Sequence, residues 1–590
     1  MSTLKGSGPQ TSDAPTPEDA FHEAAALDAR ESEPRHGSGN GGPVLAADGT
    51  PLKRSLARAL RAQKMRALAL IAPLLIFVLL TFIAPIADML FRSVENQIVR
   101  DTLPRTVEAL ADWDDTSGEL PGDAVFDAAY TDIFLAAEYK LHTRLGSRLN
   151  YELTGVSSLF RKSGRGLDDI GEVYLDQFED LDEAWDEALP WAELMGTADS
   201  VAAYKAWVKA EDKAKENNED FNDPIPAFEM RDDIADVLPR TAEAYSRFAT
   251  FVRDEDEDSP FEEEPWTLVV TRLYEDLRDG DVSSYNGPRA EMLKAADALV
   301  DSPDFQTADL QAAFGEIDED WLDTRVWQTI KTYSPAYTNG YFLNAVDMQK
   351  TPDGAAMRDE DERIYGLLFK RTMFMSLVIT FSCIALAYPV AYLLSTLPMR
   401  TANLLMILVL LPFWTSLLVR TSAWKVMLQQ QGVINDVLVW LGLVADDGRL
   451  VMINNQLGTI IAMTHILLPF MILPMYSVMS TIPPTYVRAA KSLGATNWTS
   501  FWRVYFPQSV PGIGAGSILV FILSIGYYIT PEIVGGTTGT FISNRIAYHI
   551  SSSLNWGLAA ALGTILLAVV LILYWAYDRI VGIDNVKLGG

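Results

Sequence analysis

Six stretches of the chain are apolar for long enough to cross a lipid bilayer, and they constrain the fold more than any other feature. They run from Ala67 to Leu90, Met373 to Leu397, Ala402 to Val419, Ile460 to Met479, Gly512 to Val534 and Gly557 to Tyr577. A spanning helix needs about 20 mainly apolar residues, and its backbone must be hydrogen-bonded within the segment. We therefore expect an all-α integral membrane protein with six transmembrane helices.

Positive charge before the first run sets the expected orientation. Residues 53 to 66 contain six lysines and arginines, and such a cluster holds its end of a spanning helix in the cytoplasm. Threading six spans from there places both termini inside and residues 92–366 outside. Four basic residues oppose this topology, since they fall on the outer side: Lys370, Arg371, Arg420 and Lys425.

The long segment between the first two runs is expected to be a separate domain. The chain carries a formal net charge of -31, and about four fifths of its acidic residues lie in 92–366, which argues against nucleic-acid binding. Amphipathic stretches at 178–189 and 288–299 predict a mainly helical, extracytoplasmic domain. Its acidic runs indicate either a solvated, salt-tolerant surface or a field that concentrates a cationic solute.

The sequence contains no pattern that predicts catalysis or a cofactor. The single cysteine, Cys383, lies in an apolar run, and the five histidines have no metal-ligand spacing. Neither a nucleotide-binding G-x-x-x-x-G-K-[ST] loop nor a nucleophile–base pair is found. We expect no enzyme activity, no metal and no cofactor in this chain, so an energy-coupled transporter would need a separate ATPase.

The loop after the fourth run, residues 482–511, has the features of two short helices joined at a glycine. Pro483 and Pro484 favour a helix start, and Gly494 can adopt the left-handed conformation that ends a helix. Thr496 or Asn497 can then cap the next helix. Pro507 and Pro511 would mark the turn into the fifth span.

This loop resembles the cytoplasmic "EAA" loop of permease subunits in binding-protein-dependent ABC importers, which has E-A-A, a glycine four residues later, and then I-x-L-P. The corresponding residues here are Arg488, Ala489, Ala490, Leu493, Gly494, Val504, Phe506 and Pro507. Arg488 replaces the family glutamate, so a salt bridge from that position to the ATPase is not implied. An interfacial amphipathic helix would explain the loop's aromatic residues, but it would not explain the spacing of the glycine and proline.

Further segments narrow the resemblance to spermidine/putrescine-type permeases. They are Leu411–Arg420, Gly432–Asn435, Leu441–Leu443 and Tyr528–Gly536. The resemblance covers most of residues 370–580. It does not extend to 92–366, which is far longer than the connection usual in the family.

The resemblance implies a type I ABC importer permease in a bacterial inner membrane. The implied domains are a disordered cytoplasmic tail (1–52), a basic segment with the first span (53–91), the acidic extracytoplasmic domain (92–366), a permease core with five spans and the coupling loop 482–511 (367–580), and a cytoplasmic tail (581–590). The implied partners are an ATPase dimer that uses ATP and Mg, a second permease, an extracytoplasmic substrate-binding protein and the lipid bilayer. The implied cargo is a polyamine or a similar organic cation.

Polar residues at membrane depth are costly and are therefore candidates for function. They are Glu532, Arg420, His465, Asp88 and Asn544. We favour Glu532, because it follows Pro531 where a broken helix could direct its carboxylate at an ammonium group. Trp414, Tyr527 and Tyr528 could provide aromatic faces for the same cation. Interfacial aromatics and an end-of-helix ion pair remain alternative interpretations.

A membrane receptor or signalling protein is the alternative function, since a large domain is expected between two spans. Such a protein needs a cytoplasmic output module, and the sequence offers none.

Overall fold

The computed structural model describes residues 52–218 and 220–581, which divide into two compact units between Phe91 and Arg92. The predicted terminal tails, 1–52 and 581–590, lie outside the described residues except for their innermost residue.

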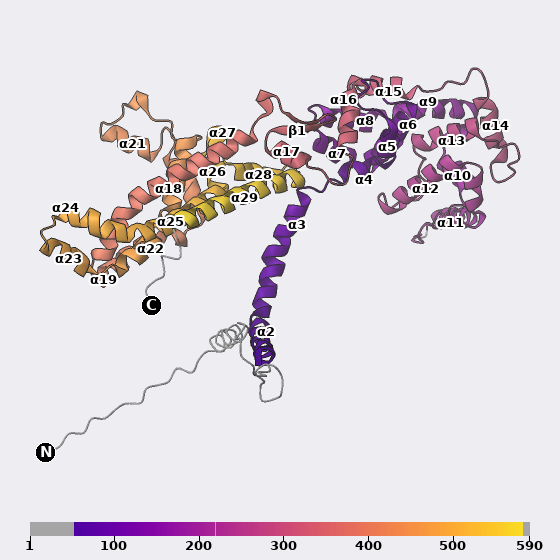
Figure 1. Ribbon diagram of the computed structural model, residues 1–590. Helices are drawn as coiled ribbons and strands as arrows, with labels where there is room; N and C mark the ends of the chain where they lie inside the picture. The colour runs from indigo at the N-terminus through magenta and orange to yellow at the C-terminus, as the bar shows by residue number, and fades with distance from the viewer. Residues whose placement is uncertain (1–51, 219, 582–590) are drawn as a thin grey trace, which may run out of the picture. The chain divides into compact units, whose positions relative to one another are not determined.

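The first unit contributes one long apolar helix (Figure 1). It consists of α2 (Leu52–Val78), a π-helical turn η1 (Leu79–Ile83) and α3 (Ala84–Arg92). Residues 63–92 pass the length and composition test for a membrane span, which confirms the first predicted run. The π turn precedes Pro85, whose ring would otherwise meet a carbonyl of the preceding turn.

Residues 98–362 form the domain inserted between the first two spans, and it is mainly helical as predicted. Its elements are α4 (Ile98–Thr102), α5 (Pro104–Ala109), η2 (Leu110–Asp112), α6 (Asp123–Glu138), α7 (His142–Leu149), α8 (Val156–Gly166), α9 (Asp168–Leu181), η3 (Glu183–Asp186), α10 (Ala188–Met195), α11 (Ala198–Glu216), η4 (Asp232–Asp236), α12 (Pro239–Asp254), α13 (Thr267–Asp279), α14 (Ala290–Val300), α15 (Leu310–Ile317), η5 (Glu319–Leu322), α16 (Thr324–Thr332), α17 (Gly340–Ala345), the antiparallel hairpin β1 (Met348–Thr351) and β2 (Gly354–Met357), and η6 (Glu360–Glu362).

One of the two amphipathic helices predicted in this domain is correct and the other is wrong. The stretch 288–299 corresponds to α14. The stretch 178–189 is not one helix, because α9 ends at Leu181 and Asp182 is extended. The Asp182 carboxylate accepts a hydrogen bond from the Ala184 N–H at 3.1 Å and so caps a new turn.

The inserted domain contains two copies of one pair of sequence patterns. The pattern D-x-L-P-R-T-x-E-A stands at residues 101–109 and again at 236–244. The pattern F-x-x-x-D-E-x-W-x-x-x-x-x-W stands at 178–191 and again at 314–327. We call these the first and second patterns. Their order along the chain, first, second, first, second, indicates an internal duplication.

The two copies also make the same hydrogen bonds. In the first pattern, the backbone N–H and Oγ1 of Thr106 donate to Asp132 Oδ2 at 2.7 and 2.9 Å, and those of Thr241 donate to Asp276 Oδ2 at 2.8 Å each. In the second pattern, the later tryptophan donates its indole N–H to the carbonyl of the earlier one. These distances are 2.8 Å for Trp191 and 2.9 Å for Trp327.

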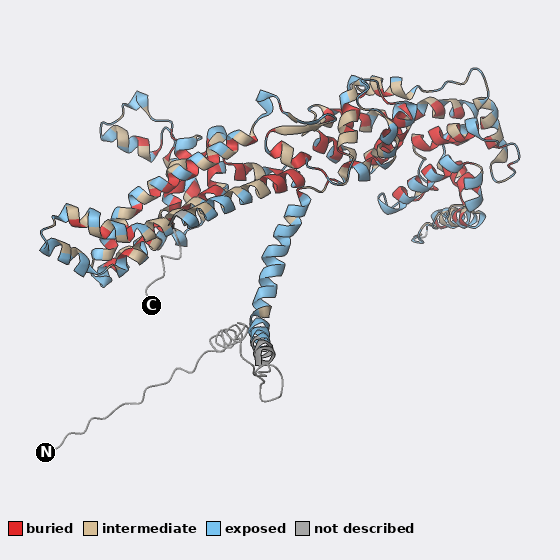
Figure 2. Ribbon diagram, in the orientation of Figure 1, coloured by how far each residue is buried: buried red, intermediate tan, exposed pale blue. Residues whose placement is uncertain are grey.

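The two copies exchange partners when they pack. One buried cluster, lobe 1, joins residues from 99–170 to Phe314, Trp321 and Trp327. The other, lobe 2, joins Phe178, Trp185 and Trp191 to residues from 234–296. The first pattern of each copy therefore packs against the second pattern of the other copy. Figure 2 shows that buried positions recur along the helices of the insertion.

Residues 365–581 form the membrane core. Its elements are α18 (Tyr365–Thr396), α19 (Met399–Leu410), η7 (Leu411–Trp414), α20 (Leu417–Met427), α21 (Val433–Trp440), η8 (Asp446–Gly448), α22 (Gln456–Thr481), α23 (Pro484–Ser492), α24 (Asn497–Ser500), η9 (Phe501–Tyr505), α25 (Phe506–Gly526), α26 (Ile529–Val534), α27 (Gly536–Gly539), α28 (Ile542–Ser551) and α29 (Trp556–Val581).

Helices α18, α22 and α25 pack together around one buried cluster that includes Cys383. The approach is close where glycines face α22. A Cβ on Gly516 would lie 2.6 Å from the sulfur of Met471, and one on Gly512 would lie 3.1 Å from the Met475 Cα. Small residues at such contacts let membrane helices pack closely without a hydrophobic driving force.

Two of the six predicted spans differ from the prediction. Over the described residues there are five helices long and apolar enough to span, and a sixth crossing only if a bent pair is counted as one. The predicted run 402–419 is this pair, with a 92° bend between Trp414 and Leu417. The bend arises because Thr415 and Ser416 are extended.

The predicted run 512–534 is displaced. Its helix runs from Asn497 to Gly526, and Tyr527 is extended, so α26 is a separate short helix.

Candidate coupling loop and substrate pathway

The loop between α22 and α25 has the predicted helix–glycine–helix form. Gly494 has a φ of 89°. Its N–H bonds to the Lys491 carbonyl at 3.0 Å, and the Ala495 N–H bonds to the Ala490 carbonyl at 3.1 Å. This pair of bonds is the Schellman ending of a helix, which favours glycine at the left-handed position. Thr496 caps α24 by accepting from the Thr499 N–H at 3.2 Å.

Two large apolar side chains of the loop are strongly exposed. Leu493 is 90% exposed and Trp498 is 72% exposed. Arg488 and Ala489 are exposed beside them, whereas Ala490 is half-buried. An exposed set of large apolar side chains indicates an interaction surface.

The opposite face of the loop is attached to the membrane core. Ile482, Val487 and Phe501 pack against the cluster that joins α18, α22 and α25. Phe501 makes an edge contact with Tyr392 of α18 at 5.7 Å and lies parallel to Tyr505 at 6.0 Å. A displacement of α23 would therefore be transmitted to three membrane helices.

The end of the loop differs from the prediction, because no turn occurs at Pro507 or Pro511. Helix α24 continues through the π-helical turn η9 into α25, and both prolines lie within one continuous helix. Pro507 is at the start of α25, where the missing N–H is tolerated after the wider π turn. Val504 and Phe506 are half-buried in this stretch.

Hydrogen bonds between hydroxyl groups connect this continuous helix to α18. The Tyr505 hydroxyl lies 3.1 Å from Ser395 Oγ, and the Tyr388 hydroxyl lies 3.0 Å from Ser509 Oγ. Sequence reasoning missed these four residues. Serines and tyrosines repeated on the inner faces of two apolar runs were the available signal.

The break after α25 positions Glu532. Its carboxylate is exposed on α26 and accepts a hydrogen bond from Asn544 Nδ2 at 2.6 Å. The same amide nitrogen donates to the Tyr528 carbonyl at 2.9 Å. Glu532 is thus oriented by an amide and not by an ion pair in the part of the chain that the structure describes, which leaves a carboxylate available to a cation.

Only three of the four predicted pathway residues lie together. Tyr527 is half-buried and Tyr528 is exposed at the same break as Glu532. Trp414 is 77% exposed at the other break, and over the described residues it makes no ring contact with either tyrosine. The two breaks are nevertheless linked, because Thr421 Oγ1 of α20 lies 3.2 Å from Thr530 Oγ1 of α26.

Two other polar residues of the membrane core have different surroundings. The indole N–H of Trp424 donates to His465 Nδ1 at 3.1 Å. Arg420 has its Nε and Nη1 atoms inaccessible to solvent and without a hydrogen-bond partner among the described residues. No group of three potential metal ligands lies together within 52–218 and 220–581.

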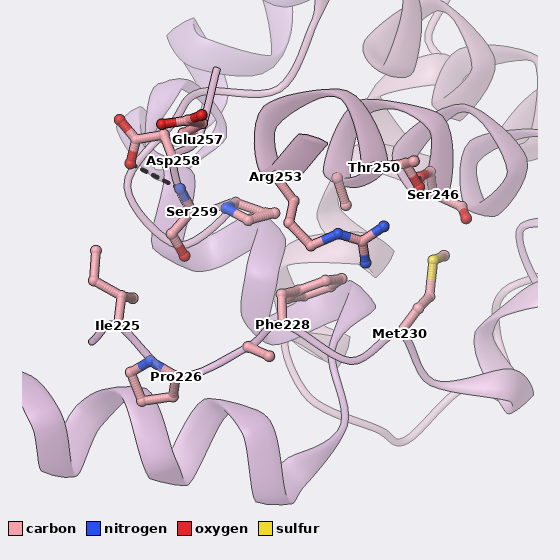
Figure 3. Close-up of a pocket in the computed structure, with 13 residues that line it drawn as sticks. Ile225, Pro226, Phe228, Met230, Ser246, Thr250, Arg253, Glu257, Asp258 and Ser259 are labelled. Carbon is pink, nitrogen blue, oxygen red and sulfur yellow. Dashed lines mark hydrogen bonds between the residues drawn. The ribbon is translucent and has the colours of Figure 1, made fainter. Parts of the chain in front are cut away.

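The inserted domain has an open hollow of about 520 Å³ in lobe 2. Figure 3 shows that its wall comes from an extended segment with Phe228 and Met230, from α12 and from the loop that holds Asp258. The charged groups at its rim are engaged locally, since Arg253 pairs with Asp254 at 2.7 Å and Asp258 accepts from the Ser259 N–H at 2.7 Å. This leaves no evident ligand chemistry.

Comparison with known proteins matches the membrane core. Residues 373–581 match the family described as binding-protein-dependent transport system inner membrane component. The spermidine/putrescine transport system permease protein PotB of Salmonella typhimurium (strain SL1344) is 33% identical over 220 residues, which are 37% of this chain and 76% of that protein. PotB of Escherichia coli K12 is 32% identical over 220 residues, 37% of this chain and 79% of that protein.

A third relative is the inner membrane ABC transporter permease protein YdcU of Escherichia coli K12. It is 32% identical over 222 residues, which are 36% of this chain and 70% of that protein. The first span and the inserted domain lie outside the family match.

Proposed function

Because the chain belongs to the family of binding-protein-dependent transport system inner membrane components, we propose that it forms part of the channel of an ATP-driven importer for a polyamine or a similar organic cation. The membrane core is an ABC permease of the polyamine type. The cargo proposal rests on the permeases to which it is similar and on Glu532. The ATPase, the second permease and the external binding protein are proposed as separate subunits.

The proposed topology places both termini and the 482–511 loop in the cytoplasm, and the 92–366 domain outside. The basic residues before the first span support this orientation. The bent pair around Trp414 is counted as one crossing, which makes six. The protein would then be a multi-pass protein of a bacterial inner membrane.

The observation that carries the proposal is the exposure of Leu493 and Trp498 in the turn and helix that follow α23. Helix α23 can lie in a groove of an ATPase, with Leu493 as the protruding side chain and Ala489 allowing close approach. Arg488, exposed on the same helix, would meet the ATPase without the family's glutamate contact. When ATP brings two ATPases together, α23 moves, and η9 and α18 move with it.

The proposed cargo site is the break between α25 and α26. An ammonium group would pair with the Glu532 carboxylate, which Asn544 holds by a 2.6 Å hydrogen bond. Tyr527 and Tyr528 would present aromatic faces to the same cation. Trp414 would contribute only if the two breaks approach each other during transport.

Co-purification tests the coupling loop. We expect the variant Leu493→Ala with Trp498→Ala to lose most of the bound ATPase and ATP-driven uptake, since these side chains supply the exposed contact area. The matched control is Trp440→Ala with Leu443→Ala, which removes similarly exposed apolar side chains from the end of α21 and the turn after it. If the loop variant keeps full ATPase binding, or if the control loses as much, the coupling assignment is wrong.

The cargo is tested with proteoliposomes that contain all subunits and labelled spermidine or putrescine. Glu532→Gln should raise the apparent KM for a cationic cargo while ATPase binding is unchanged. Uptake of neither polyamine by the wild-type complex would reject the cargo and leave the permease assignment intact.

A further inference from the structure

The first turn of helix α28 holds the carboxylate that is proposed to meet the cargo. Asn544, in that turn, donates to Glu532 Oε2 at 2.6 Å and to the Tyr528 carbonyl at 2.9 Å. Its Oδ1 accepts from the Phe541 N–H at 3.0 Å, and the side chain is buried. These bonds leave Asn544 little freedom, so a shift of the start of α28 would move the Glu532 carboxylate.

The last turn of α28 contacts the inserted domain. His549 lies in this turn and is buried. Its ring meets the ring of Tyr151, a residue of the inserted domain, edge-on at a centroid distance of 5.5 Å. Its Nε2 lies 3.1 Å from the hydroxyl of Tyr365, and its Nδ1 lies 2.8 Å from Ser553 Oγ. Both ring nitrogens are engaged, so this end of α28 is fixed between the domain and the start of α18.

One side of α28 packs against the base of the domain. Ile542 belongs to a buried cluster that also contains Tyr341 and Ala345 of α17, and Ile546 packs against the same cluster. Residues four apart lie on the same face of a helix. Helix α28 therefore contacts the inserted domain along one face as well as at its end.

On the domain side, buried ion pairs hold the turn that carries Tyr151. Glu152, the next residue, pairs with Arg148 at 2.7 Å and with Arg358 at 3.2 Å. It also accepts a hydrogen bond from the Tyr333 hydroxyl at 2.8 Å. Separating buried partners would leave a charge unpaired, which is strongly unfavourable. Tyr151 therefore presents a fixed surface to α28.

Helix α28 can connect these two contacts because it is short and continuous. Its ten residues correspond to a length of about 15 Å. We infer that the inserted domain positions the Glu532 carboxylate through α28, with Tyr151 and His549 as positioning residues. The inference rests on the proposed role of Glu532 in cargo binding. The domain would then act on transport without touching the cargo, because it holds the carboxylate in the orientation that an ammonium group meets.

Substitutions of Tyr151 test this inference. Tyr151→Ala removes the ring that meets His549, whereas Tyr151→Phe retains that ring. Tyr139→Ala is the matched control, because Tyr139 is an aromatic residue of the same domain whose ring meets Phe251 edge-on at 5.0 Å instead.

Hydrogen exchange of the full-length protein in nanodiscs tests the positioning without any cargo. Tyr151→Ala should raise exchange about fivefold within 542–551 and within 527–534, because Asn544 joins the two segments. Tyr151→Phe and Tyr139→Ala should exchange as the wild type does in both segments. Unchanged exchange of 527–534 in Tyr151→Ala would overturn the inference, and so would an equal increase in Tyr139→Ala.

Uptake by proteoliposomes that contain all subunits and labelled spermidine or putrescine tests the consequence for transport. Tyr151→Ala should raise the apparent KM about fivefold and leave kcat unchanged. In a Glu532→Gln background it should have no further effect, because it acts through the carboxylate. An equal increase in KM in both backgrounds would contradict the inference.

The two measurements separate this inference from the proposed cargo. If the wild-type complex takes up neither polyamine, the cargo proposal fails, and the exchange of 527–534 alone decides whether the domain positions Glu532.

Discussion

The membrane core and the inserted domain reach ordered packing by opposite means. In the core, long helices pack through small residues, and several polar side chains make hydroxyl or amide hydrogen bonds such as that between Thr421 and Thr530. In the inserted domain, short helices enclose two aromatic cores and are covered by ion pairs. Among the described residues, this domain holds ion pairs such as those of Arg105 and Arg358, whereas in the membrane core Arg449 forms two.

This difference follows from the solvent that each region meets. Burial of aromatic side chains drives folding in water, whereas lipid gives no such drive and rewards close contact and paired polar groups. The family match covers the core, at residues 373–581, and does not include the duplicated domain. The following experiments test this comparison.

The largest effect should come from the exchanged packing of the duplicated domain. Trp321→Ala removes a buried side chain whose indole N–H donates to Ser163 Oγ of lobe 1 at 2.9 Å. We expect a loss of about 3–5 kcal/mol in domain stability. Because its neighbours are in lobe 1, hydrogen exchange should increase within 99–170 more than within 174–300.

The matched variant is Trp185→Ala, which should loosen 174–300 instead. The same pattern of exchange in both variants would contradict the exchanged pairing.

The next effect concerns His549, at the junction of the domain and the core. Burial, with a smaller contribution from Arg545, lowers the pKa of His549 from 6.5 to about 4. The unfolded chain therefore binds more protons than the folded one between these values, so the contribution of His549 to stability is complete above pH 6.5 and is lost as the pH falls toward 4. The loss is on the order of 2 to 3 kcal/mol.

Thermal midpoints of the wild type and of His549→Gln, recorded from pH 7.5 to 5, measure this contribution. The midpoint of the variant should fall less on acidification, because it has no imidazole to protonate. Parallel curves would show that His549 is not the titrating group.

A smaller effect is expected where the domain touches α29. A Cβ on Gly557 would lie 2.4 Å from Tyr341 Cζ, so Gly557→Ala should cost about 1–3 kcal/mol through overpacking. Gly526→Ala is the control, because a Cβ there meets nothing within 4 Å. Equal thermal midpoints for the two variants would mean that Gly557 and Tyr341 are not closely packed at this junction.

The sequence predicted the core better than it predicted the domain. The length of apolar runs identified the spans, and residues 482–511 were interpreted correctly at Gly494, where only backbone geometry is involved. The helix breaks at Trp414 and Tyr527 were not predicted. Hydropathy measures only how apolar a run is, so it does not reveal extended residues within the run.

The internal duplication can be recognised in the sequence from the two repeated patterns. The packing of each copy against the other copy cannot. Which copy packs with which depends on long-range contacts that no local pattern contains. The role of Asn544 in orienting Glu532 was hidden for the same reason, since the two residues lie on different helices.

The smallest effect separates local strain from coupling. Gly494 has a φ of 89° and a Cβ there would meet nothing within 4 Å, so Gly494→Ala should cost about 1 kcal/mol through its backbone conformation alone. Gly442 also has a positive φ, 70°, and open space around it. Gly442→Ala should therefore lower the thermal midpoint equally, while only Gly494→Ala reduces ATP-driven uptake. Equal loss of uptake in both variants would show that stability, not the geometry of the 482–511 loop, limits transport.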